Sequence, residues 1–175
     1  MWFIALQFSI GVEYALHCLL YMVDFPSGKV VGIKDLATFQ GVSETYLSKV
    51  YTKLRKAGIV RSIPGVNGGY ELARNPESIT FWDIVEAVEG ASPLFQCAEI
   101  RQNNILLDKN NLPEAYTKKC PCLIKVVMLE AEDQMRQYLN NKTLLWLHEQ
   151  VHNKIPKEQG DATIEWFNNT KSRKI

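Results

Sequence analysis

The segment from residue 31 to residue 72 constrains the fold of this chain more than any other part. Apolar side chains recur at helical spacing over residues 33–40, and again from Glu44 to about Ala57. Gly41 breaks the first segment, and Ser43 stands where the N-cap of the second is expected. Two short helices joined by a turn that contains glycine form a helix-turn-helix. This pattern alone does not establish DNA binding, because many short helical hairpins have other roles.

The residues after the second helix predict a β-hairpin. Residues 59–63 are rich in β-branched side chains, residues 64–69 are dense in turn formers, and residues 70–72 alternate as a second strand. In a winged helix, a hairpin in this position lies over the DNA backbone while the second helix enters the major groove. We expect Gly65, Gly68 and Gly69 to allow positive φ and close approach to sugar-phosphate.

Basic residues are concentrated in the same region. The 175-residue chain has a net charge of only +1, but the stretch from Lys29 to Arg74 holds eight basic and three acidic residues, a net charge of +5, which leaves −4 for the rest. A local basic region in a near-neutral chain is typical of a domain with one polyanion-binding surface, because phosphate contacts supply most of the affinity. A solvated charged surface without a ligand is the alternative.

Residues 1–25 are apolar enough to raise the question of a signal peptide or membrane anchor. No Lys or Arg precedes Lys29, and a small-residue cleavage pattern is missing. Ser9, Glu13 and His17 share one helical face, and an ionised Glu in mid-bilayer costs about 3 kcal/mol. We therefore expect an amphipathic helix packed on protein, no membrane partner and a cytoplasmic location.

The second half of the chain predicts one more short helix, a long loop and a long helix. Thr80 and Asp83 form a capping-box pattern for a helix that ends at Gly90. Residues 91–121 have no sustained period and predict a loop. From Cys122, apolar residues are spaced alternately by four and three, as in a helix that packs against its twin: Ile124, Met128, Ala131, Met135 and Tyr138. An ordinary core helix is the alternative for this stripe.

Five motifs in a fixed order resemble a known family. They are the run Phe8 to Leu16, Val42-Ser43-x-x-Tyr46-Leu47-Ser48-Lys49, the run Leu54 to Val60, Gly65-x-x-Gly68-Gly69-Tyr70-x-Leu72, and Ile79-Thr80 followed by Val88-Glu89-Gly90. Over about residues 7–147 the chain is similar to the Rrf2 family of bacterial winged-helix transcription regulators. The family includes an iron-sulfur-cluster regulator, a nitric-oxide-sensing repressor and a cysteine-metabolism repressor. The resemblance implies a homodimeric regulator, most simply a repressor, that binds an inverted repeat in double-stranded DNA.

These observations combine into one expected architecture. The fold class is mainly α with a small β wing: a winged helix-turn-helix plus a long dimerisation helix. Residues 1–90 form the DNA-binding domain, 91–121 a sensing loop, 122–150 the dimerisation helix and 151–175 a C-terminal tail of unassigned structure. A winged-helix module that docks protein instead of DNA is the main rival. An enzyme is not expected, because no catalytic arrangement of Ser, His, Asp or Cys is visible.

Side chains that face outward from the second helix are the candidate DNA contacts. We expect Thr45, Ser48 and Lys49 to reach base edges, where the resemblance also puts sequence-reading residues, and expect Lys53 and Lys56 to reach phosphates. The remaining candidates are contacts to the backbone or from the wing: Ser43, Tyr46, Arg61, Val66, Asn67 and Gly68. Many relatives carry an Arg just before the wing glycines, but this chain has Pro64, so minor-groove reading by an inserted guanidinium is not expected there.

The chain holds four cysteines, of which Cys18 is expected to be a small buried hydrophobe. Cys97, Cys120 and Cys122 fall in the region where cluster-binding relatives hold an iron-sulfur cluster, but their spacing is wider and no motif names a fourth ligand. Three hypotheses stay open: an iron-sulfur cluster, a thiol switch in which Cys97 pairs with Cys120 or Cys122, and inert thiols with a different signal. Lys118 and Lys119 would stabilise a Cys120 thiolate.

Overall fold

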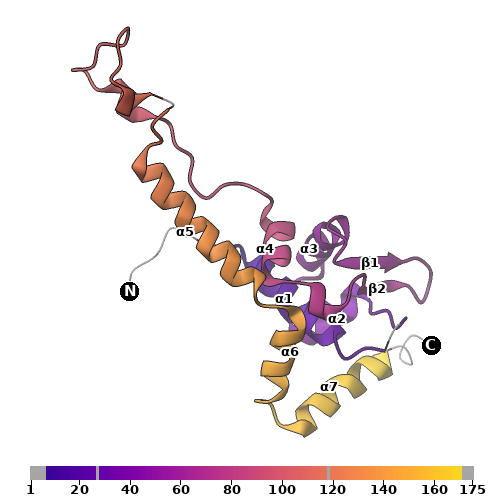
Figure 1. The fold of residues 1–175 in the computed structure, drawn as a ribbon. Coiled ribbons are helices and arrows are strands. Elements are labelled where there is room, and N and C mark those ends of the chain that lie inside the picture. Colours follow the sequence, from indigo (N-terminus) through magenta and orange to yellow (C-terminus); the bar gives the residue numbers. More distant parts are fainter. Residues whose placement is uncertain (1–6, 27, 118, 171–175) are drawn as a thin grey trace. The chain divides into compact units, whose positions relative to one another are not determined.

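A computed structural model describes residues 7–26, 28–117 and 119–170 of the chain, which is mainly α-helical with one two-stranded antiparallel sheet, as the sequence predicts (Figure 1). The elements divide into two compact units. Unit 1 contains the described residues up to Ala91 and from Leu139 onward, and unit 2 contains residues 92–138. Within the described ranges, no helix is long and apolar enough to cross a membrane.

The helix-turn-helix of unit 1 has the predicted boundaries. Helix α2 spans Ile33–Gln40 and helix α3 spans Glu44–Lys56, and between them Gly41 adopts a left-handed conformation with φ of 70°. The Ser43 hydroxyl caps α3 by accepting a hydrogen bond from the Tyr46 backbone N–H at 3.3 Å. The inward face of α3 is fully or almost fully buried through Leu47, Val50, Tyr51 and Leu54.

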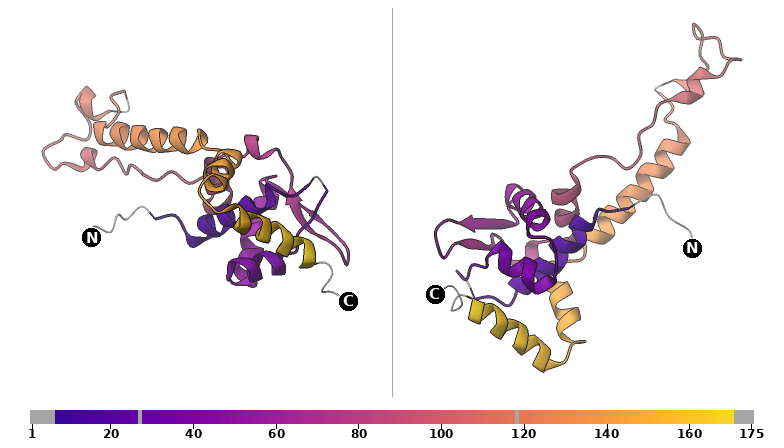
Figure 2. Two further views of the ribbon diagram at one scale, coloured as in Figure 1. Left: turned by 90° about the horizontal axis from the view of Figure 1, so that it is seen from below. Right: turned by 180° about the vertical axis from the view of Figure 1, so that it is seen from behind.

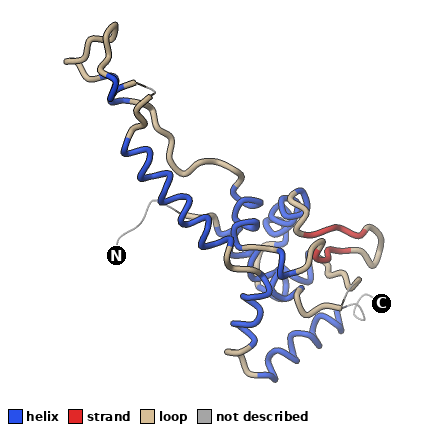
Figure 3. The backbone as a smooth tube through the Cα atoms, in the orientation of Figure 1, coloured by secondary structure: helices blue, strands red, loops and turns tan. Residues whose placement is uncertain are grey.

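The wing follows α3 directly. Strand β1 (Val60–Ile63) pairs with β2 (Gly69–Leu72) in a register that places Ile63 opposite Gly69. The two strands are the red segments of the tube in Figure 3. The expectation of positive φ is correct for Gly65, at 112°, but wrong for Gly68 and Gly69. Those two positions exclude a side chain because a Cβ would lie 2.2 Å from the Ile63 carbonyl oxygen and 2.4 Å from that of Val31, respectively. The close approach of other backbone atoms therefore explains why both positions are glycine.

Helix α1 (Ile10–Met22) runs through the core of unit 1 against α3 and helix α4 (Phe81–Glu89). The predicted polar face of α1 is exposed at Ser9, Glu13 and His17. These side chains also line part of a mainly apolar groove of about 520 Å³. Cys18 lies on the opposite face with no exposed surface, and burial raises the pKa of its thiol to about 12. Cys18 is thus the buried hydrophobe that the sequence predicts.

The predicted capping box begins α4. The Thr80 hydroxyl accepts a hydrogen bond from the Asp83 backbone N–H, and the Asp83 carboxylate accepts one from the Thr80 backbone N–H, both at 3.0 Å. Helix α6 (Leu144–His152) is joined to the same corner, because the Leu144 N–H donates to the Ile79 carbonyl at 2.8 Å. The segment 122–150 thus contains two helices, and Thr143 caps the second.

Unit 1 also contains helix α7 (Lys157–Asn169), which the sequence left unassigned. Its Phe167 is almost completely buried and contacts Phe39 at 4.8 Å and Phe25 at 5.2 Å between ring centroids. Trp166 contacts Phe39 at 4.9 Å. The pair Trp166-Phe167 in a mostly polar tail is the sequence signal that could have revealed this packing.

Unit 2 consists of a loop and helix α5 (Leu123–Asn140) up to Tyr138. The loop contains two short 3-10 helices, Ile100–Asn103 and Glu114–Tyr116, in place of any longer element. The described part of α5 has only one buried side chain, Glu132, whose carboxylate accepts hydrogen bonds from the Leu94 backbone N–H and the Arg136 guanidinium. The apolar stripe of α5 is therefore without a covering layer inside unit 2.

We predict that Phe167→Ala lowers the free energy of unfolding by about 3–5 kcal/mol, because it removes an aromatic ring from a packed cluster. Urea unfolding followed by circular dichroism measures the change. The matched control is Ile105→Ala, since the Ile105 side chain is exposed and its truncation should cost less than about 0.5 kcal/mol. A loss at Phe167 as small as at Ile105 would mean that α7 does not pack on unit 1.

Candidate nucleic-acid interface and cysteine loop

The outward face of α3 carries the side chains that the sequence assigned to DNA. Thr45, Lys49 and Lys56 are exposed, and Ser48 is half-buried. They share this face because the opposite face is fixed in the core. A polar, positively charged helix surface of this kind can enter a major groove and offer hydrogen-bond donors to base edges and phosphates.

Two of the candidates at the start of α3 have structural partners. Ser43 is the N-cap described above. The half-buried Tyr46 ring stacks edge-on against Tyr14 at 5.6 Å, and its hydroxyl lies 3.1 Å from where a Cβ on Gly11 would stand. Tyr46 thus holds α3 against α1. A contact from the Tyr46 hydroxyl to the DNA backbone stays a prediction.

The Lys53 ammonium donates a hydrogen bond to the Val88 carbonyl oxygen at 2.5 Å. That carbonyl belongs to the last turn of α4, where a cation is favoured by the helix dipole. Lys53 therefore links α3 to α4, and a Lys53 substitution would disturb packing as well as charge. Lys56, which is exposed at the end of α3, is the cleaner position for a phosphate contact.

Arg61 on β1 is paired with Glu71, the residue opposite it on β2, at 2.6 Å between Nε and Oε1. Glu71 is only 8% exposed, whereas most of the Arg61 side chain is open to solvent. The carboxylate holds the guanidinium at the root of the wing and reduces its charge there. At the wing tip, Val66 is 94% exposed and Asn67 is exposed, while Gly68 is half-buried.

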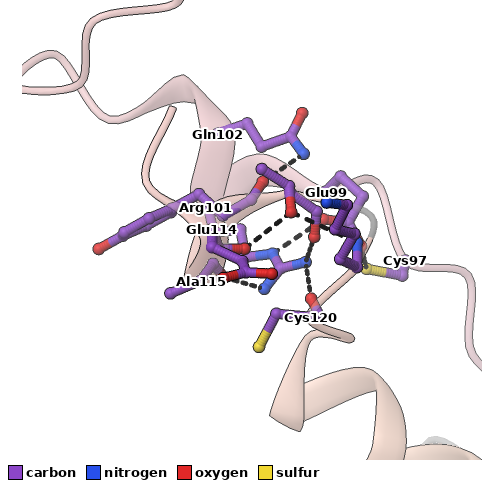
Figure 4. Close-up of polar contacts among 10 residues, drawn as sticks. Cys97, Glu99, Arg101, Gln102, Glu114, Ala115 and Cys120 are labelled. Atoms are coloured by element: carbon purple, nitrogen blue, oxygen red, sulfur yellow. Dashed lines mark hydrogen bonds and ion pairs between the residues drawn. The ribbon is translucent and has the colours of Figure 1, made fainter. Parts of the chain in front are cut away.

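Arg101 organises the cysteine loop of unit 2, as Figure 4 shows. Its guanidinium donates to the Glu99 carboxylate at 2.9 Å and to the carbonyl oxygens of Ala115 at 2.8 Å and Cys120 at 2.7 Å. The Cys97 thiol contacts the same Glu99 carboxylate at 3.6 Å. The sequence reasoning missed Glu99 and Arg101, although charged residues close to Cys97 in an otherwise polar loop were a visible signal.

Cys122 stands immediately before α5, where the backbone N–H groups of the first helical turn point toward it. Hydrogen bonds from the N–H groups of Lys125 and Ile124 lower the pKa of the Cys122 thiol, and the Arg101 guanidinium lowers it further. The Cys122 sulfur is half-buried, so a reagent can still reach it. This environment favours a thiolate.

The three loop cysteines supply soft sulfur donors of the kind that iron-sulfur clusters use. In the described residues, however, no three His, Cys, Asp or Glu side chains are arranged to hold a metal ion. Cys97 faces Glu99, and the positive charge of Arg101 lies where it interacts with the thiols of both Cys120 and Cys122. The contacts of these side chains in the described residues suit thiolate chemistry.

Comparisons with known proteins give a consistent result. A family model named Rrf2 and described as an iron-dependent transcriptional regulator matches residues 8–150. The regulator NsrR of Halalkalibacterium halodurans is 31% identical over 145 residues, which cover 78% of this chain and 99% of the relative. The protein rrf2 of Nitratidesulfovibrio vulgaris is 34% identical over 132 residues, with 75% and 80% covered.

Two solved structures of transcriptional regulators have a fold similar to that of this chain. IscR of T. potens has a TM-score of 0.61 at 25% identity, with 87% of this chain and 94% of that chain covered. The oxidised form of CymR from Staphylococcus aureus has a TM-score of 0.58 at 25% identity, with 82% and 97% covered.

We predict that iodoacetamide alkylates Cys122 and leaves Cys18 unmodified in the folded protein, because the pKa is lowered at the first thiol and raised at the second. The rate at Cys122 should rise with pH at values below the ordinary thiol pKa of about 8.5. Arg101→Gln removes a nearby positive charge and should shift this profile to higher pH. Mass spectrometry of the alkylated peptides measures each site.

The control for this experiment is Lys109→Gln, which removes a positive charge from an exposed loop position. A shift of the same size in both variants would mean that Arg101 has no specific effect on the Cys122 thiol. Alkylation of Cys18 at the rate of Cys122 would contradict the assigned environments.

Proposed function

This chain belongs to the Rrf2 family of transcriptional regulators, and from that premise we propose that it is a homodimeric, sequence-specific DNA-binding regulator whose affinity for DNA responds to the thiols of the 97–122 loop. DNA binding is the regulatory activity of a winged helix of this kind. The observation that carries the proposal is the exposed face of α3, with Lys49 and Lys56 presented beside a protruding wing.

The proposal of a homodimer rests on the apolar stripe of α5. Ile124 and Tyr138 are 68% and 64% exposed, and Leu123, Val127 and Met128 are exposed as well. Ala131 is exposed and Met135 is half-buried along the same spacing. A stripe of this length that faces solvent is unfavourable in a monomer and is buried when two copies of α5 pack together. Two joined winged domains would then meet the two halves of an inverted repeat on one face of DNA.

The proposal of a thiol signal rests on Cys122 and Arg101. A thiolate at Cys122 can react with a peroxide, and a second loop thiol, Cys97 or Cys120, can then close a disulfide. The balance is two thiols and one hydrogen peroxide giving one disulfide and two water molecules. Because Cys122 directly precedes α5, a disulfide would reposition the start of that helix and with it the two DNA-binding domains.

Anaerobic purification, with visible absorption and with iron and sulfide analysis, separates the two redox hypotheses. A colourless protein that loses two free thiols under mild peroxide and changes its DNA affinity supports the thiol signal. Coloured protein with stoichiometric iron and sulfide would overturn it in favour of a cluster. Unchanged DNA affinity after oxidation would leave the regulator with a signal that does not use these thiols.

We predict distinct effects for two lysines of α3 on DNA binding. Lys56→Ala should weaken binding to every duplex and reduce the slope of log affinity against log salt by about 0.9 per protomer, because one phosphate contact is lost. Lys49→Ala should instead relax the choice among sequences, with a cost of about 1–3 kcal/mol for the preferred site. Selection from a random duplex pool, followed by fluorescence anisotropy at several salt concentrations, measures both.

The control for the α3 variants is Lys154→Ala, at an exposed position between α6 and α7. If both α3 variants bind every duplex as the parent does, α3 is not the reading helix. Parent protein that binds no duplex in dilute buffer would favour the rival function, a winged-helix module that docks protein.

We predict that Ile124→Arg converts the dimer to a monomer, because it places a charge in the buried stripe between two copies of α5. Sedimentation velocity measures the mass, and circular dichroism verifies that the helices are retained. Asp133→Arg introduces the same side chain on a different face of α5 and should leave the dimer intact. A parent protein that sediments as a monomer would contradict the homodimer.

A further inference from the structure

We propose that unit 1 holds an anion-binding cavity at the root of the wing, and that its ligand is a small molecule with a phosphate group. The open cavity has a volume of about 460 Å³, and its cationic side chains are Lys29, Arg61 and Arg74. Its lining residues come from outside α3. The inference therefore goes beyond the proposed recognition of DNA and does not depend on it.

Three segments of unit 1 form the wall of this cavity. The first is the end of α1 with the residues that follow it, the second is the root of the wing, and the third is the segment after β2. In this order they supply Phe25 and Lys29, Arg61 and Glu71, and Arg74. Cationic side chains that are far apart in the sequence thus converge on one concave surface.

The charge of the cavity wall favours a dianion. Three cationic side chains and one carboxylate, that of Glu71, give the lining residues a net charge of +2. A concave surface with walls of low dielectric constant concentrates such a field. A phosphate monoester carries about −1.5 to −2 charges at pH 7, whereas a carboxylate carries one. Two of the cations are arginines, whose planar guanidinium groups form paired hydrogen bonds with phosphate oxygens.

Arg74 gives an independent indication of a ligand. Its Nε is buried and has no hydrogen-bond partner within the described ranges of the chain. Its Nη2 donates to Asp83 Oδ2 at 3.1 Å, and the same oxygen also accepts the Thr80 backbone N–H of the α4 capping box. A buried guanidinium nitrogen without a partner is unfavourable, and a ligand that accepts a hydrogen bond from Arg74 would relieve this cost.

Arg74 also lines a second hollow, of about 200 Å³, together with Asp83 and Glu86. The two carboxylates there would repel an anion. The phosphate group is therefore expected in the cavity that Arg74 shares with Lys29 and Arg61.

The other two cations are held at the cavity by neighbouring side chains. Arg61 binds Glu71 through its Nε at 2.6 Å, and most of the Arg61 side chain is open to solvent. The Lys29 ammonium donates to the side-chain oxygen of Asn168 and lies 4.4 Å from the centroid of the Phe25 ring, and neither of these two partners is charged. Asn168 belongs to the last turn of α7, which Figure 2 shows on the side of unit 1 that carries the strands.

The size of the cavity indicates an organic phosphate. Sites for small molecules have volumes of about 300–1,000 Å³, and this cavity falls within that range. The Phe25 ring and the Leu72 side chain line it as well and offer apolar surface to the organic part of the ligand. A phosphodiester of bound DNA carries the same chemical group, and the experiment separates these two sources.

The test is isothermal titration calorimetry of the full-length protein in chloride buffer at constant ionic strength. Ribose 5-phosphate is the probe, and ribose is the matched compound without a phosphate group. We expect ribose 5-phosphate to bind with a Kd of about 1 mM or lower. Ribose should give no heat of binding.

Two variants test the assigned side chains in opposite directions. Arg74→Gln should weaken ribose 5-phosphate binding about tenfold or more, because hydrogen bonds between a guanidinium and a phosphate are lost. Glu71→Gln should strengthen binding about fivefold, because a negative charge is removed from the cavity wall. The control is Arg55→Gln, which removes an exposed guanidinium outside the cavity and should keep the parent Kd.

Arg74→Gln also removes the contact with Asp83, so urea unfolding is measured for each variant. Arg61→Gln leaves that contact intact and should weaken binding about fivefold. It therefore tests the cavity even where Arg74→Gln does not fold.

No heat from ribose 5-phosphate at about 10 mM with the parent protein would overturn this inference. Equal losses in Arg55→Gln and Arg74→Gln would also overturn it, because they would mean a general effect of charge. Fluorescence anisotropy with a DNA duplex should give the parent affinity for Arg74→Gln. Weaker duplex binding by this variant, with no binding of ribose 5-phosphate to the parent, would assign the cavity to the DNA backbone instead.

Discussion

The burial of one face of α3 is the constraint on which the rest of unit 1 depends. Leu47, Tyr51 and Leu54 are packed without exposed surface, so the opposite face is presented to solvent in one fixed orientation. Tyr46 against Tyr14 and Lys53 on the Val88 carbonyl hold the two ends of the helix to α1 and α4. A helix that reads DNA must keep its register against the bases, and this packing supplies the rigidity.

Backbone contacts position the wing in addition to the packing of Val60 and Tyr70 on the core. Val31 and Tyr70 exchange two backbone hydrogen bonds at 2.8 and 2.9 Å, which ties the segment before α2 to strand β2. Gly69 is required there because its Cβ would meet the Val31 carbonyl. The start of α2, the wing and the C-terminal helix thereby meet around one pocket.

Unit 2 is held together mainly by charge and hydrogen bonds, whereas unit 1 has a buried apolar core. The loop of unit 2 is organised by Arg101, which binds one carboxylate and several carbonyl oxygens, and its helix leaves an apolar stripe exposed. Charge and hydrogen bonds position the thiols, while the apolar stripe of α5 stays exposed. A polar loop of this kind can respond to a chemical change at Cys122 without the cost of opening a hydrophobic core.

The sequence by itself determined the elements whose signals are local. Glycine and capping residues fixed the bounds of α2 and α3, the Thr80 capping box fixed the start of α4, and the alternating spacing from Ile124 fixed the apolar stripe of α5. Only the tertiary structure decided what depends on distant residues. The packing of Phe167 on Phe39, the bond from Lys53 to Val88, the reason for Gly69 and the role of Arg101 each join segments that are well separated along the chain. No pattern within a short stretch of sequence encodes such contacts, because they arise only when the chain has closed on itself.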